Sequence, residues 1–215
     1  QSGHSPRSRR DQLPDRPAPL STLLSAIRAC RICEAHLPLG PRPVLVAEPS
    51  APILIAGQAP GTKVHASGIP WDDPSGDRLR DWLGVDKETF YNPKNFAIVP
   101  QGFCYPGKQK SGGAAPPRPE CAKTWHPRLI PELKNVALTL AIGLYAHKYY
   151  LSSKRKKTLT ETVAGFQAYG PDILPLPHPS WRVVGWMKKN DWYEREVIPH
   201  LQQRVQELIE CRISS

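Results

Sequence analysis

The feature that most constrains this fold is a series of short apolar runs without polar alternation. Runs of this kind cover residues 53–56, 96–99, 136–142 and 172–176. A run without alternation is typical of a parallel strand that is buried on both faces of its sheet. Gly57, Pro100 and Pro177 follow three of these runs, and such residues end regular structure. The sequence therefore predicts four buried strands.

Segments with helical spacing of apolar residues separate the strands. The first helical pattern follows Ser21, which we expect to cap the helix, and another begins after Ser75 and stops at Gly84. Further helices are predicted over residues 121–133, over residues 144–151 and beyond Asn190. We expect Pro199 to kink or divide the last of them. Strands that alternate with helices predict an α/β fold, a three-layer sandwich whose central, mostly parallel four-stranded sheet is flanked by helices.

The length of 215 residues favours one globular domain. Residues 1–19 carry four arginines and four prolines, and they hold too little apolar surface to offset the entropy cost of ordering. We therefore predict a flexible basic tail over residues 1–19 and a single domain over residues 20–215.

The charge balance points to a polyanionic partner. The formal net charge is +10, which raises the expectation of nucleic-acid binding. No run approaches the roughly 18 apolar residues that a membrane-spanning helix needs, so we do not expect a membrane protein. Residues 1–16 are polar and lack the apolar core of a secretory signal, which favours a cytoplasmic location. We expect the protein to be a monomer. The basic cluster at residues 154–157 is interpreted as a solvated face in preference to a DNA contact.

The cysteines form two closely spaced pairs. Two residues separate Cys30 from Cys33, and sixteen separate Cys104 from Cys121. Four soft sulfur ligands on short spacers suit a tetrahedral zinc ion or an iron–sulfur cluster. The alternative is that these cysteines are small buried hydrophobic residues. Cys211 has no cysteine at ligand spacing and is predicted to be structural.

Three unusual segments follow strands, at residues 57–61, 100–107 and 177–182. Open parallel sheets bind ligands beyond the carboxyl ends of their strands. The glycines of residues 57–61 allow backbone amides to approach an anion or a base, although a plain tight turn has the same composition. His178 lies between two prolines, where its ring does not easily enter a core. It is a candidate functional residue, with a structural histidine as the alternative.

The order of these motifs resembles the uracil-DNA glycosylase superfamily. Cys-x2-Cys comes first, followed by Gly-Gln-Ala-Pro-Gly at 57–61, Ser-Gly-Ile-Pro-Trp at 67–71, the second cysteine pair, and His-Pro-Ser at 178–180. The similarity spans about residues 23–210 and is greatest to the branch that carries a four-iron four-sulfur (4Fe-4S) cluster. It implies a DNA-repair hydrolase that flips uracil out of DNA and hydrolyses its N-glycosidic bond, leaving an abasic site. The implied cluster ligands are Cys30, Cys33, Cys104 and Cys121.

The resemblance also implies roles for individual residues. His178 would donate a hydrogen bond to the uracil oxygen as negative charge develops there. Trp71 would stack on the flipped base, with a core tryptophan as the alternative. Gln58 would position water but cannot take its proton, so catalysis would depend on stabilising the leaving group. The remaining loop residues implied to bind substrate are Gly57, Ala59, Pro60 and Gly61.

Two positions depart from the family pattern. Relatives carry an asparagine that reads uracil shortly before the third cysteine, and here Gln101 is the available substitute, unless backbone amides read the base. Ala59 stands where other branches have a carboxylate. Asp72 and Asp73 are the nearest acids, and they are interpreted as a helix-start signal in preference to a general base.

The enzyme would need to fill the gap left by a flipped nucleotide. Pro179, Ser180, Trp181 and Arg182 resemble the family's minor-groove insertion loop, with Trp181 or Arg182 as the wedge. Lys108, and Lys110 beside it, would contact phosphates. The expected partner is uracil-containing or abasic DNA. Two alternatives remain open, a weakly catalytic or non-catalytic binder of damaged DNA and a zinc-stabilised nucleic-acid-binding module without a base pocket.

Overall fold

The computed structural model describes residues 19–214, so the predicted basic tail lies outside the described residues except for Pro19. Four strands form one sheet in the order β2-β1-β3-β4, and every pair is parallel. The strands are β1 (Ile53–Ala56), β2 (Phe96–Ile98), β3 (Leu138–Ile142) and β4 (Ile173–Leu176). In the centre of the sheet, Ile55 pairs with Ile98 on one side and with Leu140 on the other. The predicted α/β sandwich is confirmed, with an all-parallel sheet.

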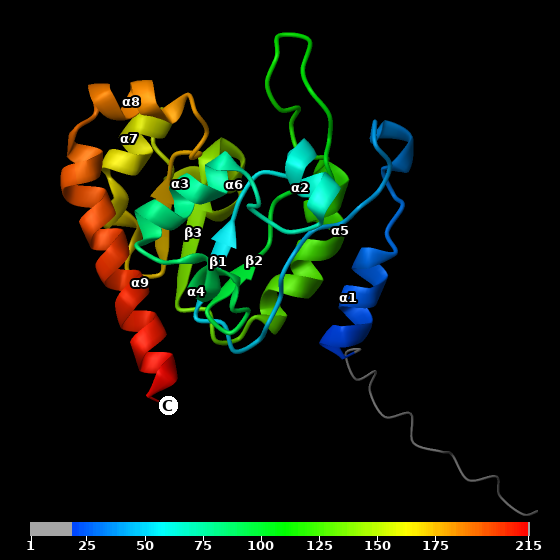
Figure 1. Ribbon diagram of the computed structural model, residues 1–215, viewed down its shortest axis with the longest axis horizontal. Helices are drawn as coiled ribbons and strands as arrows, with labels where there is room; N and C mark the ends of the chain where they lie inside the picture. The colour runs from blue at the N-terminus through cyan, green and yellow to red at the C-terminus, as the bar shows by residue number, and fades with distance from the viewer. Residues whose placement is uncertain (1–18, 215) are drawn as a thin grey trace, which may run out of the picture.

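Helices cover both faces of this sheet (Figure 1). The main helices are α1 (Leu20–Arg28) and α5 (Pro119–Leu129) on one face, and α3 (Pro74–Leu83) and α9 (Ile198–Ile213) on the other. Successive residues of β1 point to opposite faces. Leu54 is buried in a hydrophobic cluster with Ile27 of α1, whereas Ile55 is buried in a second cluster with Leu79 of α3 and Leu201 of α9. This two-sided burial explains why the strand has no polar alternation.

The ends of α1 and α3 test the helix boundaries that the sequence predicts. α1 begins at Leu20 with Pro19 at its N-cap, so the predicted cap at Ser21 is wrong. The Pro19 carbonyl accepts the first backbone hydrogen bonds, which places Ser21 inside the first turn. At α3 the helix-start interpretation of Asp73 is confirmed, because its carboxylate accepts the Gly76 N–H at 2.8 Å. α3 ends as predicted at Gly84, which has a left-handed backbone.

The remaining helices are short. They are α2 (Thr62–Ser67), α4 (Lys87–Tyr91), α6 (Gly143–Tyr150), α7 (Leu159–Ala164) and α8 (Val183–Lys189). Of these, only α6 was expected, because the others span fewer than two full turns of apolar periodicity. A π-helical turn at Tyr193–Val197 precedes α9, and Pro199 lies in the first turn of α9. The last helical segment is therefore divided near Pro199, as expected. Within residues 19–214, no helix has the length and apolarity needed to cross a membrane.

Candidate active site

A cleft of about 480 Å³ opens beyond the carboxyl ends of the strands. Its walls come from the segments that follow β1, β2 and β4, so the sheet brings together the three unusual segments of the sequence. The sequence-derived candidates that line it are Gly57, Gln58, Ala59, Pro60, Gly61, Trp71, His178, Ser180, Trp181 and Arg182. Gln101, Lys108 and Pro179 do not line it. A cleft at this edge is where parallel sheets place their ligands.

The first cleft loop is held by the segment that follows β2. The backbone N–H of Gln101 donates to the Gly57 carbonyl at 3.0 Å, and that of Gly102 donates to the Gln58 carbonyl at 2.9 Å. The Gln101 side chain is buried, at 5% exposure. Gln101 thus supports the loop through its backbone, and its buried side chain, whose Nε2 has no hydrogen-bond partner in the described part of the chain, is not among the residues that line the cleft. The Gln58 side chain lines the cleft, and its Nε2 donates to the Ala115 carbonyl at 3.2 Å.

Trp71 forms a wall of the cleft in an unusual backbone conformation. Its φ of 58° lies in the left-handed region, which a tryptophan rarely adopts. A Cβ atom on Gly57 would lie 3.0 Å from Cζ2 of Trp71, so the absence of a side chain there allows the ring to pack against the first loop. The Trp71 ring centroid lies 5.8 Å from that of His178. The two sequence candidates therefore sit side by side in one cleft.

His178 is fixed by contacts on both sides of it in the chain. Arg78 Nη1 of α3 donates to the Pro179 carbonyl at 2.9 Å. The buried His147 of α6 places Nε2 3.0 Å from the carbonyl of Leu176, the last residue of β4. Burial lowers the pKa of His178, and the Asp73 carboxylate opposes this shift. The balance is a lowered pKa, so at neutral pH the imidazole is predominantly neutral.

Asp73 is a residue whose place in the cleft the sequence reasoning missed. It is the one carboxylate among the described residues that line the cleft. One of its oxygens, Oδ1, caps α3 as expected from the sequence. Its nearness to His178 depends on how α3 packs against the segment after β4, and the sequence carries no local signal for that packing.

The mouth of the cleft is formed by two opposed segments. Trp181 is 75% exposed, and the Arg182 guanidinium lies 5.3 Å from the centre of its ring. Opposite is a hairpin at residues 107–115, in which Lys108 and Ala114 form an antiparallel bridge. A Cβ atom on Gly113 of this hairpin would lie 3.5 Å from Arg182 Nη1. In Figure 1 the hairpin is part of the long green loop that projects beyond the sheet, and Lys108 is exposed on it.

The four paired cysteines line a second, smaller cavity, which shares no lining residue with the cleft within residues 19–214. Burial raises the pKa of Cys104 to about 11 and that of Cys121 to about 12, and the neighbouring cysteines add to both shifts. The Phe103 N–H donates to Cys121 Sγ at 3.3 Å. Cys211 is exposed on α9, away from this cavity. The structure therefore places Cys30, Cys33, Cys104 and Cys121 around one cavity. That they hold a metal centre stays a prediction.

Residues 154–157 lie outside the cleft, and all but the half-buried Arg155 are exposed. This agrees with the interpretation of that cluster as a solvated face.

Comparison with known families gives an independent result. The family description that matches is the uracil DNA glycosylase superfamily, and the match covers residues 45–202. This range contains the whole sheet and every residue of the cleft except Val44. Membership supports a glycosylase-type hydrolase that acts on DNA. The chain belongs to the uracil DNA glycosylase superfamily.

Proposed function

We propose that this protein excises uracil from DNA by hydrolysing its N-glycosidic bond. The observation that carries the proposal is the pairing of Trp71 and His178 on one cleft, with their ring centroids 5.8 Å apart. A planar aromatic face beside a hydrogen-bond donor suits a flipped pyrimidine whose carbonyl oxygen becomes negative as the bond breaks. The volume of the cleft is sufficient for a single base and its sugar.

The reaction follows from these groups. The electrons of the C1′–N1 bond pass to the departing uracil, and a neutral His178 donates a hydrogen bond to the oxygen that gains charge. Gln58, held by Ala115, orients the water that attacks C1′. The water leaves its hydroxyl on the sugar, and its proton neutralises the uracil anion. Asp73 is the carboxylate of the cleft that stabilises the positive sugar.

The mouth of the cleft supports DNA as the form in which uracil is presented. Base flipping needs a side chain that enters the stack, and the exposed Trp181 stands at the edge of the cleft for this role. Lys108 projects from the opposing hairpin, where a phosphate contact would add to the general attraction of a chain with net charge +10.

We also propose that the cysteine cavity holds a four-iron four-sulfur cluster, as in the branch that the sequence resembles. The fit is supported by four thiols around one cavity and by the N–H to Cys121 Sγ hydrogen bond. Among the described residues, no three cysteine, histidine or acidic side chains converge closely enough for one metal ion. The cluster would serve as a structural cross-link.

The test is single-turnover excision from oligonucleotides that contain uracil, hypoxanthine or xanthine, with alkaline cleavage of the abasic product as readout. We expect uracil to be released and His178→Ala to lose most of the activity. The matched control is His200→Ala, because His200 is an exposed histidine on α9 outside the cleft. Absence of release from uracil DNA by the folded wild-type protein would refute the proposal.

One observation favours a second candidate, a binder of abasic or damaged DNA with weak catalysis. Neither Gln58 nor Ala59 supplies a base in the first loop, and the Gln101 side chain does not line the cleft. A mobility shift on abasic DNA without product from uracil DNA would identify this function.

A further inference from the structure

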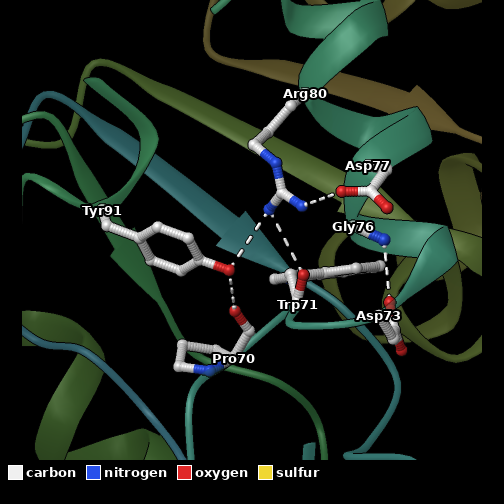
Figure 2. Close-up of polar contacts among 7 residues, drawn as sticks. All are labelled: Pro70, Trp71, Asp73, Gly76, Asp77, Arg80 and Tyr91. Carbon is white, nitrogen blue, oxygen red and sulfur yellow. Dashed lines mark hydrogen bonds and ion pairs between the residues drawn. The ribbon is translucent and has the colours of Figure 1, made fainter. Parts of the chain in front are cut away.

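A buried arginine lies behind the cleft, beneath the segment that carries Trp71. Arg80 of α3 is only 5% exposed and does not line the cleft. Its Nη1 donates to the Trp71 carbonyl at 3.2 Å and to the Tyr91 hydroxyl at 3.2 Å, while Nη2 bonds Asp77 at 2.7 Å (Figure 2). The guanidinium also lies 5.1 Å from the ring centre of Phe90. All these partners surround one charged group inside the protein.

The contacts extend to the residue before Trp71. The Tyr91 hydroxyl, which accepts from Arg80, donates in turn to the Pro70 carbonyl at 3.1 Å (Figure 2). Two successive carbonyls, those of Pro70 and Trp71, are therefore held by one connected set of hydrogen bonds. The ion pair alone does not account for the burial of Arg80, because the Asp77 side chain is 65% exposed and is screened by solvent. The two hydrogen bonds of Nη1 are directed at the Trp71 carbonyl and at Tyr91, which in turn holds the Pro70 carbonyl.

The backbone that these groups hold is strained. Trp71 has its φ at 58°, and a bulky residue stays in this region only where its surroundings enforce it. Its carbonyl also fits against the first turn of α3 only because residue 76 is glycine, since a Cβ atom there would lie 1.7 Å from the Trp71 oxygen. Strained residues of this kind gather at functional sites, and here the strained residue presents its ring to the cleft.

We propose that Arg80 is a positioning residue, which acts with Tyr91 to hold Trp71 in its left-handed conformation so that the indole faces the base site. This role rests on the proposed function in one respect only, namely that the base stacks on Trp71. The position of the indole itself can be measured without any substrate.

The first experiment measures that position. The chain has six tryptophans, and in protein labelled with 5-fluorotryptophan the Trp71 fluorine resonance is assigned by its absence in Trp71→Phe. We expect Tyr91→Phe and Arg80→Gln to shift and broaden the Trp71 resonance while those of Trp125 and Trp192 stay in place. Tyr169→Phe is the matched control, because in the described residues the buried Tyr169 hydroxyl makes no hydrogen bond. It should leave the Trp71 resonance unchanged.

The second experiment is a double-mutant cycle on uracil excision with Trp71→Ala and Arg80→Gln. If Arg80 acts through Trp71, Arg80→Gln loses about as much kcat/KM as Trp71→Ala, and the double variant loses no more than either. A structural role would instead make the losses multiply and would lower the melting temperature in step with activity.

An unchanged Trp71 resonance in folded Tyr91→Phe protein overturns the proposal, as do multiplying losses in the cycle. If Arg80→Gln does not fold, Tyr91→Phe decides by itself, because it removes one hydroxyl and keeps the ring. If the wild-type protein releases no uracil, the proposed function fails, and the fluorine experiment still decides whether Arg80 positions Trp71.

Discussion

The ring of Trp71 packs so closely on Gly57 that a Cβ atom at position 57 would lie 3.0 Å from Cζ2 of the indole. That distance is shorter than an ordinary carbon contact. Gly57→Ala should therefore displace the indole and lower single-turnover excision by between about 10-fold and 100-fold, since small displacements at a reacting centre are costly. Gly61→Ala in the same loop meets no atom within 4 Å and should lose less. Equal losses in the two variants would show that the contact is unimportant.

His178→Ala should lose about 10²- to 10³-fold in single-turnover excision, the usual cost of removing one donor to a developing anion. Gln58→Ala should lose less, because a glutamine orients water and does not accept its proton. Asp73→Asn removes the charge of the cleft carboxylate, and its loss of excision should lie between those of Gln58→Ala and His178→Ala. Near-normal excision by folded His178→Ala, together with abolished excision by Asp73→Asn, would show that activation of water contributes more to catalysis than stabilisation of the leaving group.

Stability should fall as the pH is lowered below about 6.5. Burial lowers the pKa of His147, and Arg155 adds a smaller shift in the same direction against the two carbonyl hydrogen bonds. In the unfolded chain His147 binds a proton near pH 6.5, whereas in the folded chain it binds that proton only at a lower pH. The free energy of unfolding therefore falls as the pH drops from about 6.5 through the lowered pKa of the folded state. Each such histidine contributes up to about 1.4 kcal/mol per pH unit.

Urea unfolding at pH 7.5 and at pH 5.5 measures this effect. His147→Gln should make the loss of stability between the two pH values smaller, because glutamine keeps a donor and does not titrate. The exposed His200→Gln should leave the difference unchanged. A pH dependence that is identical in wild-type and His147→Gln protein would contradict the assignment.

The cluster that we propose should give the purified protein visible absorption. Replacing Cys30 or Cys104 by alanine should abolish that absorption and lower the melting temperature, because binding of a metal centre is coupled to folding. Cys211→Ala is the control, since Cys211 is exposed on α9 and is not among the residues of the cysteine cavity. A colourless wild-type protein that contains stoichiometric zinc would contradict the cluster and show that the cavity binds zinc.

DNA affinity should fall with salt, so that log Kd rises linearly with log salt concentration, because phosphate contacts release counterions. Lys108→Ala should reduce the slope by about one if Lys108 contacts one phosphate. Lys134→Ala is a matched exposed lysine just before β3, at the opposite end of the sheet, and should leave the slope unchanged. Fluorescence anisotropy of a labelled duplex over a salt series gives both slopes.

The strands could be predicted because burial on both faces leaves an unbroken apolar run, as in Ile53–Ala56. His178 could be singled out because it lies between two prolines after a strand, whereas Trp71 could be identified only through the resemblance of residues 67–71 to the family motif. The contacts that support the site from behind could not be predicted. Arg80 and His147 form hydrogen bonds with backbone carbonyls of other segments. Every residue has a backbone carbonyl, so no residue type in the sequence marks the partner of such a contact.

Residues of the cleft come from positions 44 to 182 of the chain, and the segments that follow β1, β2 and β4 meet beyond the carboxyl ends of the strands, while the pairing of the strands is fixed behind them. The loops can therefore change in length or composition without altering the register of Ile55 with Ile98 and Leu140. Because the loops line the cleft and the strands form the core, a substitution in a loop can change the cleft without changing the stability of the core. Substitutions at loop positions such as Gln58 and Ala59 would change the lining of the cleft and leave the core around Ile55 intact.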